Sequence, residues 1–294
     1  MTTQIVIHIF PNEIDLFEWQ LRQLKLGSYY LNKEDSIIID VTLNLNLVDW
    51  SKSYIPKQFF INKFYSLQKI CDWSQNIFII DEQNKCLGCN DKRRQSIRTS
   101  TVDNIIFLDS DIFFRPELLA CISEASKHVS DNYYVISPQL PKMWDETWDE
   151  LVNENYIKLL PSIQLYENTD PFYVVTSAPK SNIIVRSINK FKFGGGWFNL
   201  FSTKLLKFID IPDSLGSYGL DDTFVMVCCE YMRIKGLNIN QYVLEGMIVT
   251  ENVKYKYNSY DGFIAPINKQ SYFKKIAEEA YQPELQNFIN KLNE

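Results

Sequence analysis

Short apolar runs alternate with segments of helical periodicity along the first part of the chain. Gln4–Phe10 and Ser36–Leu43 are rich in isoleucine and valine, which predicts two β-strands. Between them, residues 14–24 carry large apolar side chains three or four positions apart, which predicts an amphipathic helix. A strand, a helix and a second strand with short connections predict the beginning of an α/β fold with a doubly wound, mostly parallel sheet.

The same two patterns recur as far as about residue 255. Further strands are predicted over residues 76–80, 105–108, 133–137, 182–187 and 241–250. Further helices are predicted over residues 59–73, 116–130, 203–209 and 223–235, and a helical tail split at Pro283 over residues 270–294. We divide the chain into a first half of one domain (1–137), a second half of the same domain (138–255) and a C-terminal helical tail (256–294).

Two carboxylates follow the apolar run Ile105–Leu108, which has the pattern of a strand buried on both faces. They belong to Asp109 and Asp111, and open α/β sheets bind their ligands at the carboxyl ends of strands. Two close carboxylates repel each other unless a cation lies between them, and Mg²⁺ or Mn²⁺ takes such oxygen ligands. The alternative is a turn in which Asp109 or Ser110 hydrogen-bonds the backbone.

A cluster of basic residues precedes this strand and comprises Lys92, Arg93, Arg94 and Arg98. A solvated helix face is the usual explanation of such a run. The functional alternative is contact with phosphate or with an acidic acceptor, because guanidinium groups match phosphate oxygens. We favour function, because the cluster leads directly into the strand that ends at Asp109.

Two glycine-containing segments lie further along the chain. Gly194–Gly196 is followed by Trp197, and its glycines form either a flexible turn or a close backbone approach to a ligand. Gly219-Leu220-Asp221-Asp222 opens the helix predicted at 223–235, where capping and the helix dipole favour an acid. A cap requires one acid, so the pair beside glycine indicates a functional site.

Composition and charge narrow the possible functions. The chain has 294 residues, 46% of them hydrophobic and 22% charged, which is enough for a large core and excludes global disorder. The formal net charge of −6 and the pI of about 5.2 give no basic excess, so we expect no nucleic acid partner. An anionic substrate would then need a local counter-charge, most simply a metal ion.

The cysteine pattern and the N-terminus bear on the cellular setting. Cys86 and Cys89 have the spacing of a zinc knuckle, but no second pair follows and the only histidines are His8 and His128. We therefore expect free thiols and no structural zinc. The sequence has no signal-peptide pattern and no apolar run of bilayer length, so we expect no transmembrane segment and a cytoplasmic location.

The order of these motifs resembles that of nucleotide-sugar glycosyltransferases with the GT-A fold, most strongly the inverting, family-two-like group. The likeness covers most of residues 4–255. Asp109-Ser110-Asp111 is similar to the metal-binding Asp-x-Asp motif of these enzymes. Gly219–Asp222 resembles their Glu-Asp segment, in which the second acid is the general base, although Asp221 replaces the glutamate. Gly88–Arg94 resembles a glycine- and arginine-containing segment that touches the nucleotide.

The resemblance implies a GT-A fold, which is a Rossmann-like, doubly wound and mostly parallel sheet flanked by helices. It implies that residues 1–137 bind the donor and that residues 138–255 bind the acceptor and catalyse transfer. The implied enzyme is a hexosyltransferase that uses a nucleoside diphosphate sugar, most simply a UDP-sugar. The sugar would pass to a hydroxyl of a glycan, lipid-linked or protein acceptor with inversion.

The resemblance also implies roles for individual residues. Asp222 is implied to be the general base, with Asp221 beside it as a second catalytic acid. The implied cofactor is Mn²⁺ or Mg²⁺, with ligands from Asp109, Asp111 and Glu251, the last in place of a histidine common in relatives. The implied donor contacts are Asp40, Asp81, Asp91, Arg94, Asp109 and Ser110. The implied acceptor contacts are Gly195, Gly196 and Trp197.

Two other classes of function remain open from the sequence. Metal-dependent phosphotransferases of the haloacid-dehalogenase type also place an Asp-x-Asp after a strand. Their motif usually opens the domain, whereas a long stretch of chain precedes it here, and Phe113 stands where they carry threonine or valine. A non-catalytic carbohydrate-binding protein could use the aromatic residues of 138–179 as a platform, but it would not need the second acid pair.

Overall fold

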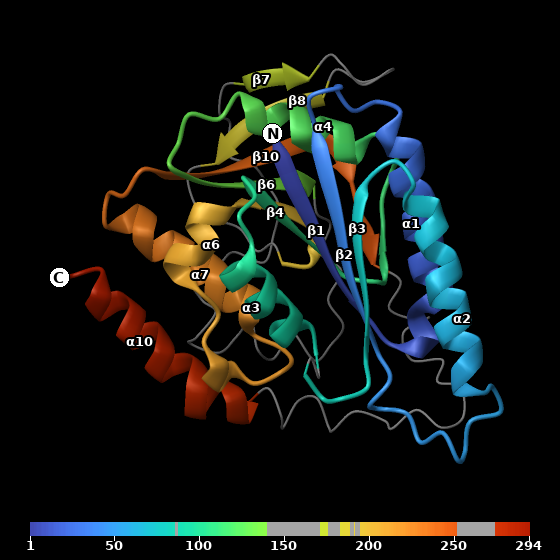
Figure 1. Ribbon diagram of the computed structural model, residues 1–294. Helices are drawn as coiled ribbons and strands as arrows, with labels where there is room; N and C mark the ends of the chain where they lie inside the picture. Colours follow the sequence, from blue (N-terminus) through green and yellow to red (C-terminus); the bar gives the residue numbers. More distant parts are fainter. Residues whose placement is uncertain (86–87, 140–170, 176–182, 189–190, 192–194, 252–273) are drawn as a thin grey trace.

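The computed structural model describes residues 1–85, 88–139, 171–175, 183–188, 191, 195–251 and 274–294 (Figure 1). The strands of its main sheet are β1 (Thr2–Ile9), β2 (Ser36–Asn44), β3 (Gln75–Asp81), β4 (Asn104–Leu108), β6 (Tyr133–Gln139), β7 (Pro171–Val175), β8 (Ile183–Ile188), β9 (Trp197–Ser202) and β10 (Ile239–Ile248). A small second sheet pairs β5 (Ile112–Phe113) with β11 (Thr250–Glu251).

The helices flank the main sheet. They are α1 (Ile14–Ser28), α2 (Lys57–Leu67), α3 (Cys89–Thr99), α4 (Leu118–Lys127), α6 (Thr203–Ile209), α7 (Asp221–Ile234) and α10 (Gln282–Lys291). Helix α1 packs against α2 and α4, while α3 packs against α6 and α10 packs against α7. Figure 1 shows α1 and α2 along one side of the sheet and the group α3, α6, α7 and α10 on the other.

The strand order is β3-β2-β1-β4-β9-β6-β10-β8-β7 within the described residues. Strands β1, β2, β3 and β4 are parallel, whereas β9 runs antiparallel to both of its neighbours, β4 and β6. Parallel strands buried on both faces need continuous apolar runs, and all five residues of β4 are buried. The predicted class, a doubly wound and mostly parallel α/β sheet, is confirmed.

Strand β9 enters the sheet through a local irregularity beside β4. The register between the two strands shifts between Phe107 and Leu108, and Phe198 on β9 has a positive φ of 64°. A positive φ is costly for a bulky residue, and its buried ring packs edge-on against Phe114 at 4.7 Å between centroids. The irregularity places the residues before Trp197 next to the end of β4.

Several predicted boundaries are wrong by a few residues. The helix predicted over 59–73 ends at Leu67 and continues as a 3-10 turn to Cys71, and helix α7 begins at Asp221 rather than at 223. The last predicted strand divides into β10 and β11. The tail is not split at Pro283, because a π-helical turn, Ala277–Tyr281, precedes the proline and gives its ring room within the helix.

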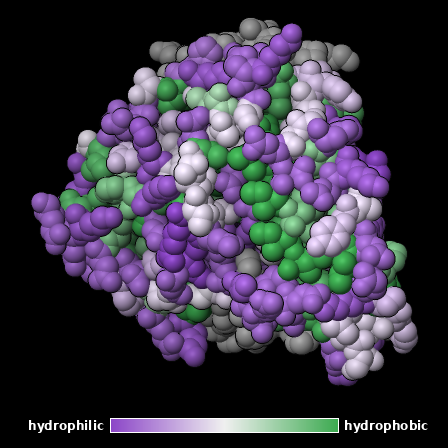
Figure 2. Space-filling model, in the orientation of Figure 1, coloured by the Kyte–Doolittle hydropathy of each residue, from purple (hydrophilic) through white to green (hydrophobic). Residues whose placement is uncertain are grey.

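Strand β3 forms one edge of the sheet and is incompletely covered. Ile77 and Ile79 are 44% and 40% exposed, because α3 packs over β1 and leaves this face of β3 open. Figure 2 shows a hydrophobic strip in the middle of this side of the molecule. No helix in the described part of the chain is long and apolar enough to cross a bilayer.

Candidate active site

The basic cluster of α3 is buried. Lys92, Arg93 and Arg94 are only 2%, 4% and 6% exposed, so a solvated helix face is excluded for these three residues. Arg98 alone of the cluster lies at the surface, where it pairs with Asp210 and Asp213. Buried guanidinium and ammonium groups need charged partners, so the carboxylates that they meet define the electrostatics of the site.

Arg93 joins the two acidic motifs. Its Nη2 donates to Asp109 Oδ1 at 2.7 Å, and its Nη1 donates to Asp221 Oδ2. The guanidinium carbon lies 4.9 Å from the ring centroid of Phe107, in a cation–π arrangement. Although burial opposes the charge, the carboxylates of Asp221 and Asp109 raise the pKa of Arg93 well above its ordinary value, so the group stays positive.

Asp109 is held by its backbone at the end of β4. Its N–H donates to the carbonyl of Gly196 at 2.7 Å, and its carbonyl accepts from Gln20 Nε2 at 2.7 Å. The neighbouring Ser110 and Asp111 are both buried. The two carboxylates of the Asp-x-Asp motif therefore differ in solvent exposure: the Asp109 side chain is 33% exposed, whereas Asp111 is buried.

The small sheet brings a third acidic position to the same place. Glu251 on β11 lies opposite Ile112 on β5, which directly follows Asp111. The backbone of Glu251 therefore lies near that of Asp111, and a metal set of Asp109, Asp111 and Glu251 stays a prediction. Among the side chains that the structure describes, no three His, Cys, Asp or Glu residues gather as a metal cluster. Carboxylate oxygens at these positions suit Mn²⁺ or Mg²⁺ by their hardness.

The two glycines before Trp197 contact one acidic motif each. A β-carbon at Gly195 would lie 2.4 Å from Asp222 Oδ2, and one at Gly196 would lie 2.1 Å from Asp109 Cγ. Asn199 on β9 holds the segment by donating to the carbonyl of Gly195 at 3.0 Å. Only glycine allows the backbone to lie this close to both carboxylates, so the glycines are required by proximity.

Trp197 itself is buried, and it pairs with Leu108 across β9 and β4. The structure therefore places the predicted acceptor contacts Gly195 and Gly196 beside the two acidic motifs. It places Trp197 in the sheet, one residue beyond them. An acceptor contact by Trp197 stays a prediction.

Asp221 and Asp222 form the first turn of α7. Leu220 precedes them in the left-handed conformation, with φ of 59°, and turns the chain sharply into the helix. The N–H of Thr223 donates to Asp222 Oδ1 at 2.6 Å. Burial and the neighbouring Asp221 carboxylate raise the pKa of Asp222 to about 7, against the attraction of Arg93. Asp222 is thus a carboxylate that exchanges its proton near neutral pH.

The loop that leads into α7 is fixed by α3. The guanidinium of Arg94 donates to the carbonyls of Pro212 and Gly216, both at 2.8 Å, and to Asp91 at 2.6 Å. Asn90 Nδ2 donates to the carbonyl of Gly219 at 3.1 Å. Asp91 and Arg94 therefore hold the loop before the second acid pair. Their contact with a donor stays a prediction, and it would be additional to these bonds.

Asp40 lies within the sheet rather than at its edge. Its carboxylate accepts from Gln4 Nε2 at 2.8 Å and from Ser96 Oγ at 3.2 Å, and it forms a buried ion pair with Lys92. All three of these partners are buried. These bonds give Asp40 a structural role, and its contact with a donor stays a prediction.

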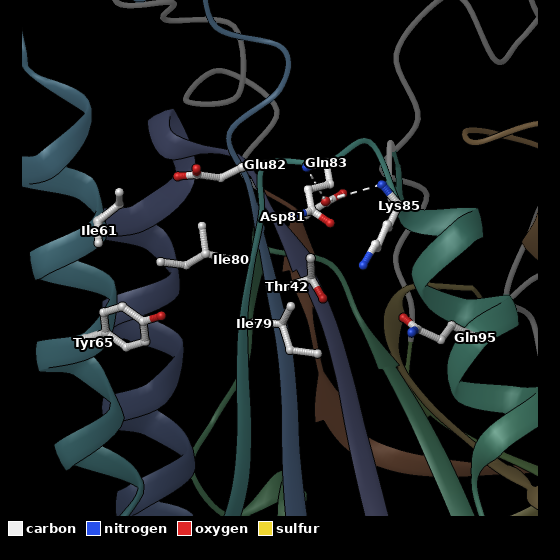
Figure 3. Close-up of a pocket in the computed structure, with 10 residues that line it drawn as sticks. All are labelled: Thr42, Ile61, Tyr65, Ile79, Ile80, Asp81, Glu82, Gln83, Lys85 and Gln95. Carbon is white, nitrogen blue, oxygen red and sulfur yellow. Dashed lines mark hydrogen bonds between the residues drawn. The ribbon is translucent and has the colours of Figure 1, made fainter.

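Asp81 ends β3 at the mouth of a pocket of about 470 Å³ (Figure 3). Its Oδ1 accepts from the N–H groups of Gln83 and Lys85 at 3.0 and 3.3 Å, which closes the turn after the strand. Figure 3 shows Gln95 of α3 on one side of the strand and Tyr65 of α2 on the other. Asp81 lines this pocket but is itself only 4% exposed, and its contact with a donor stays a prediction.

Sequence reasoning named Arg93 in the basic cluster but assigned it no role. The signal was present, because Asn90, Arg93, Arg94 and Ile97 follow helical spacing and share the buried face of α3. Polar residues at core positions of a helix indicate buried ionic partners. Gln20, which anchors Asp109, carried no comparable signal, since it is one of several polar residues in α1.

The fold places the chain among known structures, although no protein-family model and no curated protein sequence matches it. It resembles glucosyl-3-phosphoglycerate synthase from Mycobacterium tuberculosis in complex with Mn²⁺, UDP and glucosyl-3-phosphoglycerate, with a TM-score of 0.52 and 12% identity over 98% of this chain and 80% of that chain. The complex of the same enzyme with Mn²⁺, UDP-glucose and phosphoglyceric acid gives a TM-score of 0.51 and 11% identity over the same shares, 98% and 80%.

A third similar structure is S. aureus TarS 1–349 in complex with UDP-GlcNAc, with a TM-score of 0.47 and 13% identity over 99% of this chain and 72% of that chain. The likeness to the M. tuberculosis synthase, at TM-scores of 0.52 and 0.51 and identities this low, establishes the fold alone. The chain therefore has the GT-A fold of nucleotide-sugar glycosyltransferases.

Proposed function

We propose that this protein is a metal-dependent glycosyltransferase that moves a sugar from a UDP-sugar to an acceptor hydroxyl with inversion. The observation that carries the proposal is the meeting of two acidic motifs beside one glycine segment. Gly196 contacts Asp109, Gly195 contacts Asp222, and Arg93 joins Asp109 to Asp221. A donor-side carboxylate and an acceptor-side base are thereby held at adjacent positions.

The donor side would be formed at the carboxyl ends of the parallel strands, where open α/β sheets bind ligands. Asp109, Asp111 and Glu251 would hold Mn²⁺ or Mg²⁺, with Ser110 between them. The metal would neutralise the charge of the leaving nucleoside diphosphate. Asp81 lies three strand positions away, about 14 Å at the usual spacing of ~4.8 Å, so the nucleoside end of the donor would lie toward the β3 pocket.

The acceptor side would be served by Asp222 as the general base. A base works best when its pKa lies near the operating pH, and that of Asp222 is raised to about 7. Its carboxylate would take the proton of an acceptor hydroxyl as the oxygen attacks the anomeric carbon. The attack in line with the leaving diphosphate would invert the configuration. Asp221 is committed to Arg93, which supports Asp222 as the base.

Two of the solved structures support the choice of donor and cofactor. The M. tuberculosis synthase was crystallised with Mn²⁺ together with UDP or UDP-glucose. The chain shares its overall fold with this synthase. This shared fold argues against the phosphotransferase alternative. The alternative of a non-catalytic binding protein does not explain the buried network around Asp221 and Asp222.

The test is release of UDP from a panel of UDP-sugars in the presence of Mn²⁺ and candidate hydroxyl acceptors. Wild-type protein should release UDP, EDTA should stop the release, and Asp222→Asn should retain donor binding while losing transfer. The anomeric configuration of the product, measured by NMR, should be opposite to that of the donor. Binding of sugar without any UDP release would favour a carbohydrate-binding protein. Retention of configuration would refute the single-displacement mechanism.

A further inference from the structure

The rigid guanidinium group of Arg93 bonds to two different parts of the site. Its two terminal nitrogens donate to carboxylates that lie far apart in the sequence, at Asp109 after β4 and Asp221 at the start of α7. A guanidinium is planar, so bonds from both terminal nitrogens fix the separation of the two acceptors. The Arg93 side chain is only 5% exposed, so solvent screens these charges little.

The surrounding contacts hold Arg93 in this position from α3. Gly88 directly precedes the helix, and a β-carbon there would lie 2.0 Å from the carbonyl oxygen of Ser217. The N–H of Asn90 donates to the same carbonyl at 3.1 Å. These contacts tie α3 to the loop before α7, so Arg93 and Asp221 belong to one packed unit.

The two partners of Arg93 differ in how else they are held. Asp109 is anchored through its backbone by Gly196 and Gln20, independently of Arg93. Asp221 is drawn to Arg93 through its side chain, in an ion pair whose two members are 5% and 4% exposed. Loss of Arg93 should therefore disturb the start of α7, which carries Asp222, more than it disturbs the end of β4.

We propose that Arg93 is a positioning residue for transfer: its guanidinium sets the place of Asp221, and through it of Asp222, relative to Asp109. This inference rests on the proposed glycosyltransferase function. Arg93 acts through the carboxylates and does not itself contact the substrate. Its removal should lower kcat more than it lowers the affinity for the donor. Misplacement of a catalytic group by about 1 Å costs on the order of 10²-fold in rate.

The experiment compares Arg93→Ala and Arg93→Lys with the wild type and with Arg22→Ala, a surface arginine of α1 paired with Glu18. Measured quantities are kcat, the donor dissociation constant by calorimetry and the melting temperature. Arg93→Ala should lose about 10²-fold in kcat and less than about tenfold in donor affinity. Arg93→Lys should also be impaired, because one ammonium cannot replace two fixed donors. Arg22→Ala should retain wild-type kcat.

Chemical rescue separates positioning from a general effect on folding. Millimolar guanidinium chloride, far below denaturing concentrations, should restore part of the kcat of Arg93→Ala and leave Asp222→Asn inactive. Equal losses of kcat and donor affinity without rescue would overturn the inference, as would wild-type kcat in Arg93→Lys. If Arg93→Ala does not fold, the kcat of Arg93→Lys decides. A wild type that releases no UDP from any nucleotide sugar would instead refute the proposed function.

Discussion

Gly196 lies against the carboxylate of Asp109 so closely that a β-carbon at position 196 would be 2.1 Å from Asp109 Cγ. Gly195 lies equally close to the second acidic motif, because a β-carbon at position 195 would be 2.4 Å from Asp222 Oδ2. One short segment therefore lies against both acidic motifs. The two contacts can be broken separately, since each belongs to a different glycine.

Gly196→Ala and Gly195→Ala should have different effects. The methyl group of Gly196→Ala would displace Asp109, so metal-dependent binding of UDP should weaken by at least tenfold. The methyl group of Gly195→Ala would displace Asp222, so transfer should fall by about 10²-fold with UDP affinity nearly unchanged. Calorimetry with UDP and Mn²⁺, combined with a UDP-release assay, measures both effects.

Gly27→Ala is the matched control for these substitutions. Its β-carbon would lie 2.3 Å from the carbonyl oxygen of Pro116, which is as crowded but lies on α1. It should lower the melting temperature without changing UDP affinity or kcat. The same reduction of UDP affinity in Gly27→Ala and Gly196→Ala would show that crowding acts through the fold and not through Asp109.

Asp222→Asn should bind donor normally and lose about 10²–10⁴-fold in transfer, because the amide keeps the size but removes the base. The substitution should also raise the melting temperature at pH 8. The folded pKa is about 7 and the unfolded value is 3.8, so the wild-type fold loses stability as pH rises from about 4 to 7. The variants should have equal melting temperatures near pH 4. An active Asp222→Asn together with an inactive Asp221→Asn would reverse the two roles.

The pH dependence of transfer should report the same group. A general base must be deprotonated, and the pKa of Asp222 is raised to about 7 by burial and by Asp221. The rate at low substrate concentration should therefore increase as pH rises through about 7 and level off above it. An acidic limb near pH 4 would mean that Asp222 titrates as an ordinary carboxyl, and the basis for its assignment would fail.

The dependence of UDP binding on a metal ion should require the carboxylate of Asp111. Because this carboxylate is buried, Asp111→Asn is preferable to alanine, which would leave a cavity. The variant should fold, and its affinity for UDP in Mn²⁺ should fall to the level that the wild type has in EDTA. UDP titrations of both proteins with and without EDTA measure this. Unchanged affinity in Asp111→Asn or in EDTA would contradict a metal between Asp109 and Asp111.

Arg94→Ala should act mainly on stability. Its guanidinium donates to Pro212 O, Gly216 O and Asp91, which together hold the loop before α7. Loss of buried, charge-assisted bonds should cost on the order of 2–3 kcal/mol in the free energy of unfolding. Urea denaturation measures the loss, and Arg98→Ala, at the surface of the same helix, should cost less than about 1 kcal/mol. A large loss of UDP affinity without destabilisation would favour direct donor contact by Arg94.

The local patterns of the sequence determined most of the elements and the two acidic motifs. The apolar run before Asp109 predicts a buried strand because a strand covered on both faces must be apolar throughout. The acids at Asp221 and Asp222 predict a helix start because the helix dipole and the free N–H groups there favour carboxylates. These are interactions between residues close in sequence, and the pattern of residue types is sufficient to reveal them.

The tertiary structure alone decided which of these residues meet. Asp40 has the residue type of a donor contact, yet its position within the sheet commits it to Lys92. Arg93 contacts both acidic motifs because α3 packs on β1, the neighbour of β4, and against the loop before α7. Such contacts depend on strand order and on the packing of distant segments. No short stretch of sequence carries that information, because each partner's local pattern is compatible with other neighbours.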